Sequence, residues 1–246
     1  MDRSEPEAQR LAPTRRELSR ATTSDFDPEA SWWPAVALGL WAYRLVFVGR
    51  IVVLGREHLR RRGSILVSNH SRASDAIILA LLFGPGHSLV QAETFQLPVL
   101  GRLLARSGQI ALTPGRSREA LELAAGCLRR GRPVLIYPEG RLNHGGDLLR
   151  GKTGAARLAL QSGAPIQPLA VHVPEKFSRT FRGRAYARET VGTWQIGGPA
   201  YVAIGAPWQP FSPGAREASG AELRQVTDEV MSRVAVLLNT ARSAAG

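Results

Sequence analysis

The chain has 246 residues, of which 44% are apolar and 21% are charged. This mixture is typical of a globular protein, and the length suits one large domain or two small ones. The single cysteine, Cys127, excludes an intramolecular disulfide and fits a reducing compartment.

The net charge at pH 7 is +12 and is unevenly distributed along the chain. Residues 1–31 carry five arginines and seven acidic side chains, a net charge of −2, so the rest of the chain carries +14. Such a surface favours anionic partners, which include phospholipid headgroups, nucleic acid and an acidic carrier protein. Since 30 of the 32 basic residues are arginine, codon bias is an alternative explanation for part of the excess.

The N-terminal region divides into two segments. Residues 1–31 lack apolar periodicity, and we expect them to form a mobile tail. The segment 32–48, WWPAVALGLWAYRLVFV, has Arg44 as its single charge and is rich in tryptophan and tyrosine, which prefer a membrane interface. It is shorter than the roughly 20 apolar residues of a spanning helix. We therefore expect residues 32–50 to form a membrane-associated helical segment lying in one leaflet, with a buried core helix as the alternative.

From residue 51 onward, short apolar runs alternate with amphipathic ones. The runs that predict strands are 64–69, 88–92, 109–113, 132–138, 165–171 and 200–208. Helices are predicted over 75–83, 98–107, 117–130, 154–162 and 221–238, with Ser117 capping the third helix and Gly131 ending it. This alternation predicts an α/β layered domain over 51–246, with a mostly parallel central sheet flanked by helices.

A histidine and a carboxylate bracket the short polar gap in ILVSNHSRASDAIILALL, residues 65–82. Residues five apart on one helix point about 140° apart, so His70 and Asp75 cannot cooperate from a single helix. If His70 ends a strand and Asp75 begins the next helix, the loop can fold the carboxylate onto the imidazole and leave Nε2 as a base. A simple helix cap at Ser74 or Asp75 is the alternative explanation of this motif alone.

Three further segments place basic side chains near predicted strand ends or helix starts. Arg116 follows a strand and precedes a helix, where backbone N–H groups already favour an anion. In Pro138-Glu139-Gly140-Arg141, the glycine permits a tight turn and the arginine suits phosphate recognition. Lys152, one of two lysines, precedes another helix. Taken singly, each segment also fits an ordinary turn or a solvated cation.

Taken together and in this order, these segments resemble the glycerophospholipid acyltransferase family, which includes the 1-acylglycerol-3-phosphate and glycerol-3-phosphate acyltransferases. The resemblance covers roughly residues 50–210. It rests on Asn69-His70…Asp75, Arg116, Pro138-Glu139-Gly140 and Pro165…Pro168, with VVLGREHL at 52–59 similar to the family's entry strand.

The resemblance implies an O-acyltransferase that moves a fatty acyl group from acyl-CoA or acyl carrier protein to the hydroxyl of a lysophospholipid, in the simplest case 1-acylglycerol-3-phosphate. His70 and Asp75 would be catalytic. The implied substrate-binding residues are Asn69, Arg72, Arg116, Glu139, Gly140, Arg141 and Lys152. No metal and no cofactor is expected, and the enzyme would bind membrane lipids at the cytoplasmic face.

Two departures from the family's pattern concern the acceptor. Arg72 stands where the family often has serine, and Arg141 directly follows Glu139-Gly140 where threonine is usual. They leave open the same chemistry on a glycolipid, another lysolipid or a specialised metabolite. A non-catalytic lipid-binding protein is a second alternative. A nucleic-acid partner is not expected, because the chain contains no recognised nucleic-acid-binding motif.

The segment KFSRTFRGRAY, residues 176–186, interleaves aromatic and basic side chains. This composition indicates a further contact with a lipid surface, or alternatively an exposed loop.

Overall fold

The computed structural model describes residues 33–246, apart from 61, 85, 98, 144–146, 186–187, 213 and 216. The predicted tail 1–31 and Trp32 lie outside the described residues.

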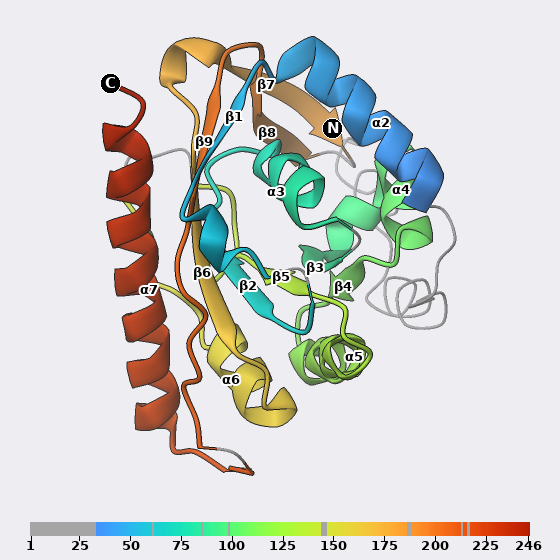
Figure 1. The fold of residues 1–246 in the computed structure, drawn as a ribbon. Coiled ribbons are helices and arrows are strands. Elements are labelled where there is room, and N and C mark those ends of the chain that lie inside the picture. The colour runs from blue at the N-terminus through green and yellow to red at the C-terminus, as the bar shows by residue number, and fades with distance from the viewer. Residues whose placement is uncertain are drawn as a thin grey trace, which may run out of the picture.

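A seven-stranded sheet forms the centre of the molecule (Figure 1), in the order β1-β9-β6-β2-β5-β3-β4. Neighbouring strands run parallel, except that β6 and β9 pair antiparallel. The predicted mostly parallel α/β sheet is therefore confirmed. Its strands are β1 Ile51–Leu54, β2 Ile65–Ser68, β3 His87–Gln91, β4 Ile110–Leu112, β5 Val134–Ile136, β6 Ile166–His172 and β9 Ala200–Ile204.

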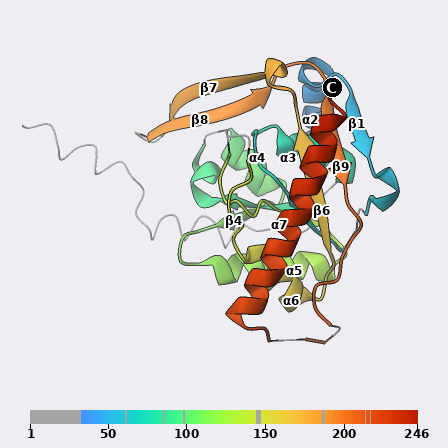
Figure 2. The same cartoon turned by 90° about the vertical axis from the view of Figure 1, so that its left-hand side faces the viewer.

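Helices cover both faces of this sheet (Figures 1 and 2). On one face, α5, α6 and α7 form a core with Ile65 and Val67 of β2. On the other face, α3 packs on Leu66 of the same strand. This division follows from the strand period of two, which sends successive side chains to opposite faces. The helices are α2 Trp33–Phe47, α3 Asp75–Phe83, α4 Leu100–Arg106, α5 Ser117–Arg129, α6 Gly154–Ser162 and α7 Gly220–Ser243.

The predicted elements of the main sheet are all present, with two local corrections. The third predicted helix begins at Ser117, but its N-cap residue is Arg116 and no side chain caps it, so the capping role predicted for Ser117 was wrong. The predicted strand 200–208 ends at Ile204, and Trp208 returns only as an isolated bridge to Ile166.

Helix α2 lies along the surface next to α3. Val36 is buried, and so is Val48, the residue that follows the helix. Leu38 and Leu45 are largely exposed. The alternative of a buried core helix therefore does not describe α2. In the described part of the chain, no helix combines the length and apolar character needed to cross a bilayer.

A two-stranded antiparallel hairpin, β7 Ser178–Ala185 and β8 Arg188–Gln195, reaches out from the main sheet (Figure 2). The exposed loop considered for residues 176–186 is wrong for 178–185, which form β7. A short 3-10 turn, Glu175–Phe177, precedes it. Long strands without regular apolar alternation give little sequence signal, which explains why this hairpin was not predicted.

The polar segments singled out from the sequence lie beyond the carboxyl ends of strands in the parallel part of the main sheet. Residues 69–75 follow β2, residues 137–141 follow β5, and residues 113–116 follow β4. Because β2 and β5 are parallel neighbours, their ends meet at one edge of the sheet. This edge is where open α/β sheets bind ligands.

Candidate active site

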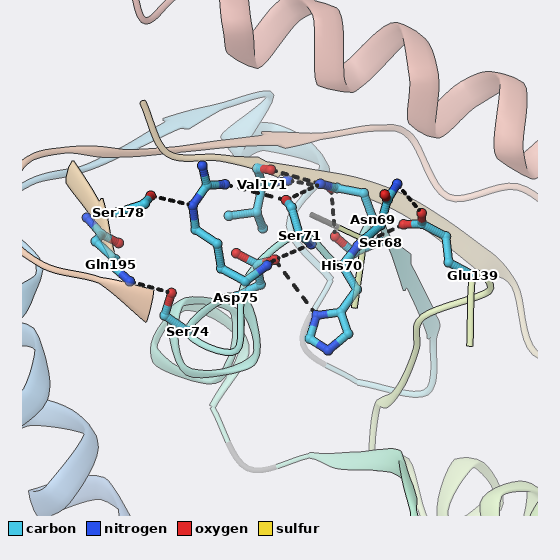
Figure 3. A network of polar contacts seen from close by, with 12 residues as sticks. Ser68, Asn69, His70, Ser71, Ser74, Asp75, Glu139, Val171, Ser178 and Gln195 are labelled. Atoms are coloured by element: carbon cyan, nitrogen blue, oxygen red, sulfur yellow. Dashed lines mark hydrogen bonds and ion pairs between the residues drawn. The ribbon is translucent and has the colours of Figure 1, made fainter. Parts of the chain in front are cut away.

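His70 and Asp75 lie together at the end of β2, as the loop geometry predicts. His70 Nδ1 is 3.8 Å from Asp75 Oδ2 (Figure 3), longer than a hydrogen bond but within the range of an ion pair. The imidazole is 19% exposed, whereas the carboxylate is fully buried. The second ring nitrogen points away from Asp75. Such distances are often long without substrate and tighten in the reacting complex.

Asp75 is held at the first position of α3 by the loop that it follows. Its Oδ2 accepts hydrogen bonds from the backbone N–H groups of Ser71 at 2.9 Å and Arg72 at 2.8 Å. Ser74, at the N-cap position, makes no capping hydrogen bond. Asp75 Oδ1 and His70 Nδ1 are buried, and neither has a hydrogen-bond partner in the described residues. The oxygen that faces the imidazole, Oδ2, is thus held in place by the two backbone N–H groups.

Tyr137 is a part of the site that the sequence analysis missed. Its ring stacks on His70 with a centroid distance of 3.9 Å and an interplanar angle of 14°. Burial and the nearby Asp75 charge raise the pKa of Tyr137 well above its usual value, so the phenol stays neutral. The ring therefore fixes the plane of the imidazole without contributing charge. Tyr137 directly follows β5, so in the sequence it looked like the end of an apolar strand.

Glu139 supports the backbone of His70 from the neighbouring strand end. Its Oε1 accepts a hydrogen bond from His70 N at 3.0 Å. Its Oε2 accepts from Asn143 Nδ2 at 2.8 Å and from Leu149 N at 3.0 Å. The backbone N–H of Asn143 in turn donates to His70 O at 2.7 Å. The carboxylate thus supports the histidine loop, and its predicted contact with substrate stays a prediction.

Asn69 joins β2 to β6 through its side-chain amide. Its Nδ2 donates to Val171 O at 3.0 Å, and its Oδ1 accepts from Val171 N at 2.9 Å. The side chain therefore pairs like an additional peptide unit and is buried among protein atoms. Figure 3 shows Asn69 and Glu139 directed toward β6, while the imidazole points the other way. The predicted role of Asn69 in substrate binding stays a prediction.

Arg72 is buried and binds the chain that follows β6. Its Nε donates to Ser178 Oγ and its Nη2 to Val173 O, both at 2.6 Å. Burial lowers the pKa of the guanidinium, and the Asp75 and Glu175 charges oppose that shift. The side chain stays cationic at neutral pH. These contacts explain the departure at this position as a structural anchor, and a direct contact with substrate stays a prediction.

Gly140 brings Lys152 over the turn after β5. Its φ of 70° is in the left-handed region that favours glycine, and a Cβ there would lie 2.7 Å from Lys152 Nζ. The backbone of Lys152 donates to Pro138 O at 2.8 Å. Gly140 O accepts from Gln91 Nε2 at 2.7 Å. The predicted tight turn is confirmed, and it positions the lysine ammonium at the carboxyl edge of the sheet.

Two arginines extend this positive edge. Arg141 is exposed directly after Gly140, and Arg116 follows β4 with a side chain that is 39% exposed. Arg116 Nε pairs with Glu119 at 3.0 Å, which partly offsets its charge. Strands β5 and β4 are separated by β3, so their ends lie about 10 Å apart. Lys152, Arg141 and Arg116, here called the positive row, therefore follow or adjoin strand ends at the same edge of the sheet as His70, and their predicted contact with phosphate stays a prediction.

A polar cavity of about 360 Å³ lies behind the histidine loop. Its lining includes Asn69, Arg72, Glu139, His172 and Arg242. Burial lowers the pKa of His172, and the positive charges of Arg72 and Arg242 lower it further. The cavity adjoins the supporting side chains of the loop rather than the positive row.

The arrangement resembles known proteins in sequence as well as in fold. The Acyltransferase family profile matches residues 50–172, half of the chain. A 1-acyl-sn-glycerol-3-phosphate acyltransferase of Pseudomonas aeruginosa is 29% identical over 135 residues, 53% of this chain and 52% of that protein. The enzyme of the same name from Borreliella burgdorferi is 29% identical over 147 residues, 58% of this chain and 57% of that protein. The chain thus spans about half the length of the curated relatives it matches.

A solved structure supports the fold independently. The crystal structure of the 1-acyl-sn-glycerophosphate acyltransferase PlsC from Thermotoga maritima superimposes with a TM-score of 0.58 at 23% identity. The match covers 79% of this chain and 74% of that chain. With the family match over the segment that contains His70, Asp75, Arg116 and Glu139, these similarities lead to one assignment: the chain belongs to the Acyltransferase family.

Proposed function

We propose that this chain is an O-acyltransferase that transfers a fatty acyl group to the free hydroxyl of a lysophospholipid, most directly 1-acylglycerol-3-phosphate. The observation that carries the proposal is the partly exposed His70 imidazole, 3.8 Å from the buried Asp75 carboxylate, beside a positive row. Relatives named as 1-acyl-sn-glycerol-3-phosphate acyltransferases support the same reaction and the same place in phospholipid synthesis.

The reaction follows from the chemistry of these groups. His70 Nε2 accepts the proton of the acceptor hydroxyl while the hydroxyl oxygen attacks the carbonyl carbon of the acyl thioester. Asp75 stabilises the imidazolium that forms. The tetrahedral intermediate then collapses with cleavage of the C–S bond, and the leaving thiolate takes the proton from the imidazolium. The products are an ester and a free thiol, with no covalent enzyme intermediate.

The positive row supports a phosphate-bearing acceptor. Lys152, Arg141 and Arg116 would hold the phosphate at the carboxyl edge of the sheet, where arginine offers bidentate hydrogen bonds and lysine a point charge. The thioester donor would be acyl-CoA or acyl carrier protein. Both are anionic, and the positive charge of the chain after residue 31 attracts either one. The proposed reaction requires neither a metal nor a cofactor.

The proposal includes attachment to the cytoplasmic face of a membrane. Helix α2 exposes Leu38, Trp41 and Leu45, a composition that suits the boundary between headgroups and acyl chains. An interfacial helix would hold the active site against the layer that contains both lysolipid and product.

The test is mass spectrometry of the products that the purified full chain makes from mixed lysolipids, with acyl-CoA and acyl carrier protein as alternative donors. We expect phosphatidate from lysophosphatidate, with His70→Ala and Asp75→Asn reducing turnover by about 10²- to 10⁴-fold. His58→Ala serves as the control, because that histidine lies in the turn after β1, away from the site.

The outcome also separates the alternatives. Turnover of another lysolipid or a glycolipid, but not of lysophosphatidate, would show that the acceptor is that lipid instead. Unchanged turnover in His70→Ala would refute the catalytic assignment. Lipid binding by the wild-type chain without any ester product would support a non-catalytic lipid-binding protein.

A further inference from the structure

Exposed large apolar side chains gather on one side of the molecule. In the described part of the chain, α2 and the β7–β8 region supply most of them, namely Leu38, Trp41, Leu45, Val46, Phe47, Phe181, Val191 and Ile196. The others lie on α4, as Val99 and Leu103, and on α7, as Val236. A contiguous exposed apolar surface of this kind marks an interaction site.

The register of the hairpin divides its side chains between two faces. Ser178, Thr180 and Thr193 share one face, which lines the polar cavity. Arg179 pairs with Trp194, and Phe181 pairs with Gly192, so these residues share the opposite face. Phe181 is 55% exposed there. The first face therefore lines the cavity through these three residues and exposes Arg182 and Val191 further along the hairpin, while the second face presents Phe181 and Arg179.

Contacts with α2 join the second face to the helix. The Tyr43 ring lies 6.3 Å from the Trp194 ring and 5.1 Å from the Phe47 ring. The Tyr43 hydroxyl donates to Gln195 O at 3.0 Å, and Gly197 N donates to Phe47 O at 2.8 Å. Figure 1 shows the hairpin and α2 at the same end of the molecule. The helix and the hairpin thus form one continuous surface.

Basic side chains border this surface. Lys176 and Arg179 are exposed before and along β7, and Arg44 is exposed on α2. Glu175 is the acidic residue exposed beside them in the described part of the hairpin region. A mixture of exposed aromatic, aliphatic and basic side chains matches the surface of a bilayer that contains anionic phospholipids.

We propose that the β7–β8 hairpin is a second membrane contact, which with α2 forms a single docking surface for an anionic bilayer. The inference rests on the proposed function, whose substrate and product are anionic lipids of such a bilayer. Phe181 inserts at the headgroup boundary, while Arg179, on the same face of the hairpin, pairs with phosphates.

The hairpin also forms hydrogen bonds with the loop between His70 and Asp75. Ala73 N donates to Thr193 O at 2.9 Å, and Gln195 N donates to Ser74 Oγ at 3.2 Å. Arg72 adds its bond to Ser178. Docking through the hairpin therefore fixes the height of the catalytic loop above the bilayer.

Site-specific fluorescence tests the insertion directly. Cys127 is the sole cysteine and is fully buried, so Phe181→Cys provides an accessible site for an environment-sensitive label. Vesicles of phosphatidylcholine with one quarter phosphatidylglycerol are added without acyl donor. We expect a blue shift of the label at position 181. The matched control is Val236→Cys, at an apolar position that is 64% exposed on α7, where we expect no shift.

Vesicle co-sedimentation gives the affinity. Arg179→Ala should weaken binding by about fivefold, since a single arginine contributes about that factor near an anionic surface. Arg118→Ala, whose side chain is 92% exposed on α5, should bind as the wild type does. Melting temperatures of all variants confirm that these exposed substitutions leave the fold intact.

The results separate this inference from the proposed function. No shift at position 181 together with unchanged affinity of Arg179→Ala would overturn the hairpin contact, whatever the turnover. A shift at 181 with reduced affinity of that variant, in a chain that transfers no acyl group, would uphold the membrane contact and sink the proposed function alone.

Discussion

The carboxylate of Glu139 accepts a hydrogen bond from the backbone N–H of His70 at 3.0 Å, across 69 residues of sequence. This bond joins two of the four segments that carry the family resemblance. The other carboxylate oxygen of Glu139 is held by Asn143 and Leu149, so the side chain is fixed in position. A fixed carboxylate can hold the backbone that presents the imidazole, which explains why a buried glutamate follows Pro138.

Replacing Glu139 with glutamine tests this support. The glutamine side chain keeps one oxygen that can accept a hydrogen bond. Its NH₂ group replaces the other oxygen and would face N–H donors, either that of His70 or those of Asn143 and Leu149. We expect a loss of about 1–3 kcal/mol in the free energy of unfolding, from the unsatisfied buried donors. The value of kcat should fall while the chain still folds. Urea denaturation and steady-state kinetics measure the two effects, and a variant with wild-type stability and kcat would contradict the supporting role.

Gly140→Ala should disturb both the turn and Lys152. The added Cβ would meet Lys152 Cε at 2.8 Å, so the ammonium must move. The matched control is Gly163→Ala, with a φ of 68° and open space around its Cβ. Both variants should lose about 1–2 kcal/mol from left-handed backbone strain. Only Gly140→Ala should raise KM for a phosphate-bearing acceptor, and equal KM values in the two variants would argue against Lys152 as a phosphate contact.

Arg72→Lys should loosen the loop between His70 and Asp75. A lysine ammonium cannot reproduce the two directed bonds to Ser178 and Val173. We expect a loss of about 2 kcal/mol in the free energy of unfolding, typical of hydrogen bonds made by a charged group. Hydrogen exchange at the amide of Ala73, which is bonded to the hairpin, should become faster. Arg179→Lys, at an exposed position, should change neither quantity.

His87 should make stability depend on mildly acidic pH. Burial lowers its pKa below the usual 6.5, and Arg132 and Arg130 lower it further, against the bond between Nδ1 and Gly108 O. The unfolded chain therefore binds this proton first as the pH falls. The contribution of the neutral ring is complete above pH 6.5 and is lost progressively below it. In thermal unfolding between pH 7.5 and 5, His87→Asn should show a flatter loss of Tm than the wild type, and parallel curves would contradict the assignment.

Sequence patterns predicted the parts of the site that depend on local order. The strand before His70 and the helix from Asp75 followed from apolar periodicity, and the glycine at 140 predicted a tight turn. The structure adds what depends on long-range contacts. Tyr137 reads as the last residue of a strand, and its stacking on His70 joins β5 to β2, which no local pattern encodes.

Dependence on long-range contacts also explains two other differences from the sequence analysis: Arg72 binds other parts of the chain, and the β7–β8 hairpin was not predicted. A buried arginine beside a catalytic motif resembles a substrate contact in the sequence, because its acceptors, Ser178 and Val173, lie about a hundred residues later. Those acceptors belong to segments around β7, which lacks apolar alternation. The predicted role of Arg72 depended on a partner that the sequence did not reveal.

The hydrogen bonds that hold residues 69–74 have a consequence for biosynthesis. Besides Glu139 and Asn143, their partners include Val171, Val173, Ser178, Thr193 and Gln195. A ribosome therefore releases His70 long before the later residues that order its loop. Because contacts of high sequence separation form late, this loop is completed only after the hairpin has emerged. A nascent chain stopped before residue 178 would contain the complete His70–Asp75 motif and still lack an ordered active site.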